Sequence, residues 1–259
     1  MGRFDGILIC SDIDGTLADR RDIPQRNVDA IRYFQSEGGR FTLATGRNFR
    51  YLERLPQVSV NGPMITENGT RIFDPALGRT LWTFPLDSSG LLLEWIDLQP
   101  IRKILMGFTD EFIDGVDGKV TDTVLSHTSG ELLQIACAFD TEEEAIAFRD
   151  RARETFGRRY DIHRSWPTGV EFISPLGGKG NSLNCLKCAV SDSVHTVIAV
   201  GDFENDRAFL QNADRGFAPS NACPEVLEVA EQILCNYREG AIGDLIQRLD
   251  EEYERGRKI

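Results

Sequence analysis

Residues 7–11 (ILICS) form a continuous apolar run that ends at two aspartates, Asp12 and Asp14. A strand that is buried on both faces has such a run, because neither set of alternating side chains meets water. Strands of this kind lie in parallel sheets covered by helices on both sides. The run therefore predicts a parallel α/β sheet, and it raises the question of why two acids stand at the strand's end.

The first third of the chain alternates between strand-like and helix-like segments, and the last third repeats this style. A βαβαβ order predicts a parallel sheet with crossover helices. The expected strands are 7–11, 40–45, 63–68, 195–200 and 215–220, and the expected helices are 24–37, 48–55, 180–190, 203–213, 223–232 and 241–256.

The middle of the chain is richer in strands. We expect strands at 103–108, 111–116, 131–139 and 169–174, and helices at 87–99 and 141–156. Thr141 precedes three glutamates, a favourable start for a helix. This composition indicates a separate α+β unit at about 84–174, inserted into a core made of residues 1–83 and 175–259.

The two aspartates occupy positions i and i+2, which point the same way along a strand. They lie just beyond its carboxyl end, where ligands of open α/β sheets bind. Asp14-Gly15 alone also fits a simple turn. Two other expected strands end in a comparable way, one at Thr45-Gly46-Arg47 and one at Gly201-Asp202 with Asp206 close behind.

If these strands are parallel neighbours, one sheet edge collects Asp12, Asp14, Thr45, Asp202 and Asp206. Four carboxylates in one pocket repel one another by several kcal/mol at an effective dielectric of ~20, so the site needs a cation. Oxygen ligands without His or Cys favour Mg²⁺.

The motifs DIDGT, ATGR, GGKGN and GDFEND, in this order, resemble the four motifs of the haloacid dehalogenase superfamily. The long insertion between the second and third motifs resembles the Cof-type, class IIB branch with its C2-type cap domain. The segment NGPMITENGTRIFD and the SNA at 220–222 resemble that branch too. The resemblance implies a Rossmann-like core and a Mg²⁺-dependent phosphatase that acts on a small phosphorylated metabolite, such as a sugar phosphate or a related phosphomonoester.

The resemblance also implies roles for the motif residues. Asp12 matches the nucleophile that forms an aspartyl-phosphate, and Asp14 matches the general acid and base. Thr45 and the Gly46 N–H match the phosphoryl-binding position. Lys179 matches the third motif and would offset charge on Asp12 and the phosphate, although a lysine between glycines also fits a solvated loop.

Metal contacts are expected from the Asp12 carboxylate, the Asp14 backbone carbonyl and Asp202. Asp206 would lie beside the metal and orient a bound water or Lys179. Asn205 is expected to contact the phosphate or the metal shell. Arg47 either positions the substrate or pairs with an acid at the core surface.

Several other residues carry weaker expectations. Five residues of the inserted unit, His127, His163, Arg164, Trp166 and Glu171, are candidates for the substrate pocket, although surface or packing roles are the ordinary interpretation. The CxxC of Cys185 and Cys188 lies in a helical stretch without a second such pair, which favours packing over metal or redox chemistry.

Net charge limits the partners. A charge of −12 and no basic stripe disfavour nucleic acid, and no apolar stretch reaches the ~18 residues that a membrane span needs. With no recognisable signal peptide, we expect a cytoplasmic protein. No heptad pattern predicts an oligomeric state. Two other functions stay open: a phosphomutase on the same core, and a non-catalytic regulator that binds a phosphometabolite.

Overall fold

The structure is a computed structural model that describes residues 2–19 and 22–256. Its central layer, here the core sheet, has five strands in the order β13-β12-β11-β1-β2, and all neighbours are parallel. The strands are β1 (Ile7–Ser11), β2 (Arg40–Leu43), β11 (Thr196–Val200), β12 (Arg215–Pro219) and β13 (Gln232–Leu234). The α/β class expected from the sequence is confirmed.

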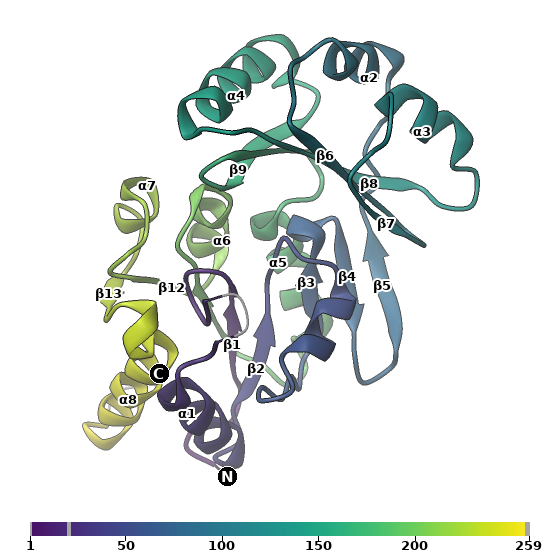
Figure 1. Cartoon of the computed structure of the whole chain (residues 1–259). Coiled ribbons are helices and arrows are strands. Elements are labelled where there is room, and N and C mark those ends of the chain that lie inside the picture. The colour runs from purple at the N-terminus through teal and green to yellow at the C-terminus, as the bar shows by residue number, and fades with distance from the viewer. Residues whose placement is uncertain (1, 20–21, 257–259) are drawn as a thin grey trace.

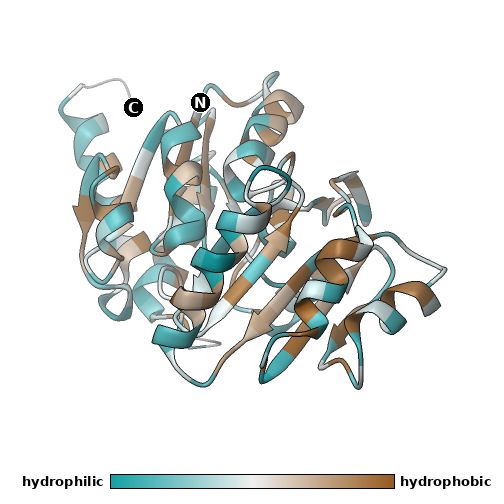
Figure 2. Ribbon diagram, turned by 90° about the horizontal axis from the view of Figure 1, so that it is seen from above, coloured by the Kyte–Doolittle hydropathy of each residue, from teal (hydrophilic) through white to brown (hydrophobic). Residues whose placement is uncertain are grey.

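Helices cover both faces of the core sheet (Figure 1). They are α1 (Gln25–Ser36), α5 (Lys179–Val190), α6 (Arg207–Asn212), α7 (Pro224–Leu227) and α8 (Ala241–Glu254), with short 3₁₀ turns η1 (Phe49–Arg54), η3 (Glu204–Asp206) and η4 (Tyr237–Glu239). In Figure 2 most helices carry both hydrophilic and hydrophobic stretches, as expected for helices that cover a core on one side.

Strand β1 shows why its run is apolar throughout. Ile7 and Ile9 pack in the hydrophobic cluster under α1 and α8, whereas Leu8 and Cys10 pack in the cluster under α5 and α6. All four side chains are buried, and each full burial of a large apolar side chain is worth about 1.5–3 kcal/mol. The next residue on the α5 side is Asp12.

A small antiparallel sheet joins the core to the inserted unit. It consists of β3 (Met64–Thr66), β4 (Arg71–Asp74) and β5 (Arg79–Thr83), with the 3₁₀ turn η2 (Glu67–Gly69) between its first two strands. The expected third core strand at 63–68 is therefore wrong in part. It starts this connecting sheet and keeps only one parallel bridge toward the core, between Ala44 and Ile65.

The inserted unit has its own antiparallel sheet, with the order β7-β6-β8-β10-β9. Its elements are α2 (Gly90–Asp97), β6 (Lys103–Phe108), β7 (Phe112–Asp114), α3 (Val120–Ser126), β8 (Leu132–Ala138), α4 (Glu142–Phe156), β9 (Asp161–Trp166) and β10 (Gly169–Ile173). Helices α2, α3 and α4 cover the face of this inserted sheet that points away from the core (Figure 1). They enclose a separate hydrophobic cluster around Met106, Phe148 and Phe172.

The two chain segments that connect the core to the inserted unit pass each other closely. Gly69, with φ of +88°, approaches the backbone of Gly178 so closely that a Cβ would collide with its carbonyl group. The Ser182 hydroxyl donates a hydrogen bond of 2.5 Å to the Gly69 carbonyl oxygen. The chain thus leaves the core and returns to it at one point.

Other differences from the expected elements are local. The helix expected at 48–55 is the 3₁₀ turn η1, and the helix expected at 223–232 ends at Leu227. The chain then becomes strand β13, because the Glu231 N–H already bonds to the Gly216 carbonyl and leads the segment to the sheet. Strands β4, β5 and β9 and helix α3 were not expected. None of the described helices has the length and apolar character that a bilayer crossing requires.

Candidate active site

The core sheet places the ends of three strands side by side. β1 lies between β11 and β2, with Ser11 in register with Val200 on one side and with Leu43 on the other. The Asp12 N–H extends the ladder by donating to the Val200 carbonyl at 2.8 Å. Residues that follow these strands therefore meet at one edge, as the parallel order predicted.

Lys179 is the centre of a buried charge cluster at this edge. It is the first residue of α5, and only 2% of it is exposed. Its Nζ donates to Asp12 Oδ1 and to Asp206 Oδ1, both at 2.7 Å. Burial alone would lower the pKa of Lys179, but the attraction of the two carboxylates outweighs it and the pKa is raised. The lysine is thus held as a cation between two acids and is not a solvated loop charge.

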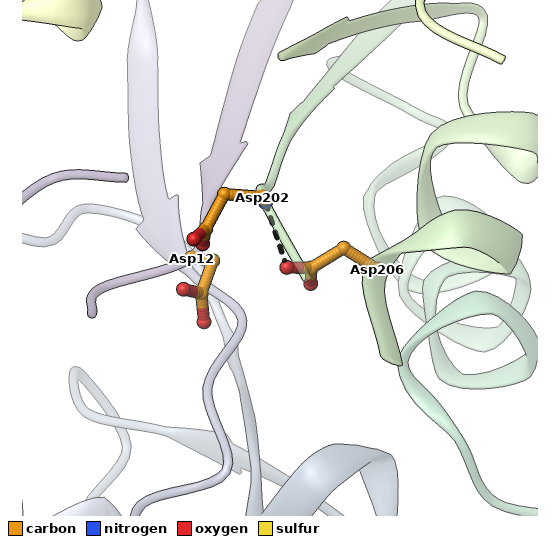
Figure 3. Close-up of side chains that lie close together, drawn as sticks. All are labelled: Asp12, Asp202 and Asp206. Carbon is orange, nitrogen blue, oxygen red and sulfur yellow. Dashed lines mark hydrogen bonds between the residues drawn. The ribbon is translucent and has the colours of Figure 1, made fainter. Parts of the chain in front are cut away.

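Asp12, Asp202 and Asp206 lie close together (Figure 3), and one carboxylate oxygen from each lies within 4.8 Å of the others. Asp206 Oδ2 accepts hydrogen bonds from the Asp202 N–H (3.0 Å) and the Phe203 N–H (3.2 Å). Asp202 Oδ1 accepts one from the Thr16 hydroxyl at 2.9 Å. These bonds hold the loop after β11 against the loop after β1.

The cluster is short of positive charge. Burial raises the pKa of Asp12 to about 7, even though Lys179 opposes the shift. Burial raises the pKa of Asp202 well above its usual range, and the neighbouring charges of Asp12 and Asp206 add to the effect. One lysine does not compensate three carboxylates, of which Asp12 and Asp206 are buried and Asp202 is half-buried, so a further cation would stabilise their ionised forms.

The donor atoms fit a small hard cation. Asp12 Oδ2 and Asp202 Oδ2 accept no hydrogen bond from any residue that the structure describes. Mg²⁺ is usually held by one or two carboxylates, with water and substrate phosphate completing the shell. Asp206, by contrast, uses both of its oxygens to accept N–H bonds.

Asp14 lies beside this cluster and differs from it in exposure. Its side chain is 43% exposed and forms a two-point ion pair with Arg47, with Nε–Oδ2 and Nη2–Oδ1 distances of 2.6 Å. The Arg47 guanidinium also stacks 4.1 Å above the centre of the Tyr51 ring. Asp14 and Arg47 both line the cavity described below, so the pair faces the space in which a ligand would lie.

The remaining predicted residues surround the same edge. Thr45 is buried, and its hydroxyl accepts a hydrogen bond from the Arg47 N–H at 3.1 Å. Gly46 lines the cavity. The Asn205 amide donates to Asn68 Oδ1 at 2.8 Å, and its own Oδ1 is buried without a partner among the described residues. An unpaired buried oxygen of this kind is suited to a ligand or a bound water.

Asn68 is a site residue that the sequence analysis missed. It adopts a left-handed backbone with φ of 53°, and its amide donates to Ser165 Oγ at 3.0 Å and to Glu171 Oε2. It thereby links Asn205 of the core to two strands of the inserted sheet. Asn68-Gly69 is a turn signal after a strand, but nothing local to it indicates contacts so far along the chain.

A cavity of about 1270 Å³ lies between the core and the inserted unit. From the core side it is lined by Asp12, Asp14, Arg47 and Asn205, and from the inserted side by Phe108, Gln134, Trp166 and Glu171. Two of the five weaker candidates, Trp166 and Glu171, thus reach the cavity. Arg164 instead pairs with Glu142 and Glu204, and His127 stacks on Phe108.

His163 is buried and bonds to Asp161 at 3.3 Å. Cys185 and Cys188 are both free thiols on α5. Neither cysteine belongs to a metal-binding group within the described part of the chain.

Three comparisons place this geometry among known proteins. The haloacid dehalogenase-like hydrolase family matches residues 9–104 and 116–246. The chain is 26% identical over 246 residues to the HMP-PP phosphatase of Yersinia pestis, covering 87% of this chain and 88% of that protein. It is 23% identical over 260 residues to the 5-amino-6-(5-phospho-D-ribitylamino)uracil phosphatase YitU of Bacillus subtilis, covering 93% and 96%.

A solved haloacid dehalogenase-like hydrolase from B. subtilis shares the fold, with a TM-score of 0.82 and 18% identity, over 93% of this chain and 99% of that one. The family match spans both stretches of the core sheet and most of the inserted unit, and it includes every strand end that contributes an acid to the cluster. The chain therefore belongs to the haloacid dehalogenase-like hydrolases, and within that superfamily it is of the Cof type.

Proposed function

We propose that the protein is a Mg²⁺-dependent phosphatase that hydrolyses a small phosphorylated metabolite through an aspartyl-phosphate on Asp12. Phosphoester hydrolysis is the activity that the family and the names of its curated relatives support. The observation that carries the proposal is the charge cluster of Asp12, Lys179, Asp202 and Asp206 beside a large cavity that Asp12 lines.

The position of Asp12 suits a nucleophile. Lys179 donates to Oδ1, whose other lone pair would face the cation, and Oδ2 accepts no hydrogen bond from the described residues and would attack phosphorus. The new bond forms between Oδ2 and phosphorus while the bond from phosphorus to the leaving oxygen breaks. Asp14 protonates that oxygen, and it later takes a proton from the water that cleaves the aspartyl-phosphate. One carboxyl group serves both steps because their proton demands are opposite.

We assign the binding of Mg²⁺ to the Asp12 and Asp202 carboxylates and the Asp14 carbonyl, with Asp206 beside them. The bound ion would neutralise charge on the phosphoryl oxygens. Asp206 fixes the Lys179 ammonium and the loop after β11 through three hydrogen bonds. Thr45, the Gly46 N–H and the second N–H of the Asn205 amide would donate to phosphoryl oxygens.

The inserted unit would act as the cap that selects the substrate, and we retain the boundaries 84–174 for it. Its sheet forms one wall of the cavity, which shields the reaction from bulk water. On the core side, Arg50 and Arg54 line the cavity and have no carboxylate partner within the described residues. Two uncompensated cations there favour an anionic substrate such as a sugar phosphate or a related phosphomonoester.

The test is phosphate release from p-nitrophenyl phosphate with Mg²⁺ and with EDTA. Wild type is expected to be active only with Mg²⁺, and Asp12→Asn to lose at least about 10³-fold in kcat. Asp29→Asn is the matched control, because Asp29 is an exposed aspartate on α1. Equal activity of Asp12→Asn and wild type, or full activity in EDTA, contradicts the proposal.

A further inference from the structure

The cavity-facing side of the inserted sheet carries polar side chains, whereas its opposite side packs in a hydrophobic cluster. Along β8, Ile135 and Cys137 point into the hydrophobic cluster under the helices, so Gln134 and Ala136 point the other way. Ala136 is in register with Glu171 of β10, and both line the cavity. This face is thus available to a ligand and is not part of the packed core.

Gln134 is the side chain on this face whose hydrogen-bonding capacity is least satisfied. Only 3% of the residue is exposed, and its Oε1 is buried and accepts no hydrogen bond from the part of the chain that the structure describes. Its Nε2 donates to none of the residues described by the structure. Buried amides are nearly always paired, and leaving one unpaired costs stability. An unpaired amide that is kept in a cavity wall, despite its cost in stability, indicates that its hydrogen-bond partner is a ligand.

The surroundings of Gln134 leave room for that ligand. Its neighbour across the strand pair is Gly107, where a Cβ would lie 3.0 Å from Gln134 Cγ. Ala136, the next residue on the same face, is also small. Two aromatic side chains, Phe108 and Trp166, line the same cavity, and rings of this kind stack favourably on planar ligands.

A primary amide presents one donor and one acceptor side by side, and turning the amide over only exchanges them. Its best partner is therefore an edge with an N–H beside an acceptor, the pattern that glutamine binds at two points on nucleic-acid bases. We propose that Gln134 determines specificity by binding such an amide-like edge on a planar nitrogen heterocycle in the leaving group. This inference rests on the proposed phosphatase function and names its substrate class.

The test compares the variant Gln134→Met with wild type on four phosphoesters. Uridine 5′-monophosphate and flavin mononucleotide carry the amide-like edge, ribose 5-phosphate carries only hydroxyls, and p-nitrophenyl phosphate carries neither. Wild type should have a higher kcat/KM for the two heterocyclic esters than for ribose 5-phosphate. The variant should lose about 5- to 100-fold on the heterocyclic esters and less than twofold on the other two.

Two further measurements distinguish recognition from a structural role. Without ligand, Gln134→Met should melt at the same temperature as wild type or higher, because an unpaired buried amide is removed. Gln99→Met is the control: Gln99 also belongs to the inserted unit, but its amide donates to the Trp95 carbonyl at 3.1 Å. It should leave the ratio of kcat/KM values unchanged. Gln134→Ala provides a second, smaller replacement.

The outcomes separate the two proposals. A wild type that hydrolyses none of the four esters refutes the phosphatase function. A wild type that prefers ribose 5-phosphate, or a Gln134→Met variant that loses equally on all active substrates, overturns the assignment of Gln134 while phosphatase activity stands. A variant that loses only on ribose 5-phosphate makes the partner a sugar hydroxyl and also overturns it.

Discussion

Replacing Lys179 with methionine removes the cation from the acidic cluster with little change in shape. Asp12, Asp202 and Asp206 would then face one another without a counter-charge. Two unit charges 4.8 Å apart repel by roughly 3.5 kcal/mol at an effective dielectric of about 20. Removing one partner of a buried ion pair typically costs about 3–5 kcal/mol. We therefore expect Lys179→Met to lose about 3–5 kcal/mol of unfolding free energy at pH 8 without metal.

The loss should depend on pH in a defined direction. Protons neutralise the carboxylates as the pH falls, so the variant should lose less at pH 5 than at pH 8. Added Mg²⁺ should recover part of the loss, since the ion supplies positive charge at the same place. Urea unfolding followed by far-ultraviolet circular dichroism, in EDTA and in Mg²⁺, measures each quantity.

The matched control is Lys187→Met, on the same helix. Lys187 forms an ion pair of 2.6 Å with Asp214, but both side chains are about one-third exposed. Exposed pairs of this kind contribute less than about 1 kcal/mol. The reasoning fails if the two variants lose the same free energy at pH 8, or if the loss from Lys179→Met is equal at pH 5 and pH 8.

Three further predictions concern other parts of the molecule. Burial and the neighbouring charges of Asp12 and Asp206 raise the pKa of Asp202 in the folded protein, so its ionised form costs stability at a pH above the pKa of an unfolded aspartate, which is about 4. Metal-free Asp202→Asn should thus be more stable than wild type at pH 7.5, with a gain that vanishes near pH 4, and a pH-independent difference in melting temperature contradicts this. Thr141→Ala removes the capping box of α4 and should cost about 1 kcal/mol in urea unfolding, against less than about 0.5 kcal/mol for Thr155→Ala on the same helix. Arg47→Lys loses the two-point contact with Asp14 and should lower kcat/KM for p-nitrophenyl phosphate roughly tenfold. The free energy of unfolding should change by less than about 1 kcal/mol. An unchanged kcat/KM argues against a role for this pair.

The acid-rich edge of the core sheet was predictable because its geometry follows from local rules. A strand buried on both faces fixes which way Asp12 points, and parallel neighbours bring Asp202 to it. The same rules do not predict the small sheet that connects the core to the inserted unit. The sequence of Met64–Thr66 is typical of one more buried strand. Only its pairing with β4, which in turn pairs with β5, shows that it leaves the core sheet. Those partners are short and partly exposed, so they lack a strong hydrophobic period.

The cavity wall opposite the acid-rich edge could not be predicted from the sequence for a different reason. Gln134 lies within an apolar stretch, and its importance comes from the absence of a partner, which only the folded structure reveals. Asn68 contacts residues about a hundred positions away, Ser165 and Glu171. Long-range side-chain contacts of this kind depend on how two layers meet, and no local pattern encodes that.

The crossing of Gly69 and Gly178 has a consequence for how such a protein can change during evolution. Since the chain departs and returns at one spot, the segment 70–177 is a loop whose two ends are already joined by the core. Replacing it with a longer or shorter module would cost little closure entropy. Recombination at these glycines can therefore supply a new cavity wall while the acid-rich edge of the core sheet is inherited intact.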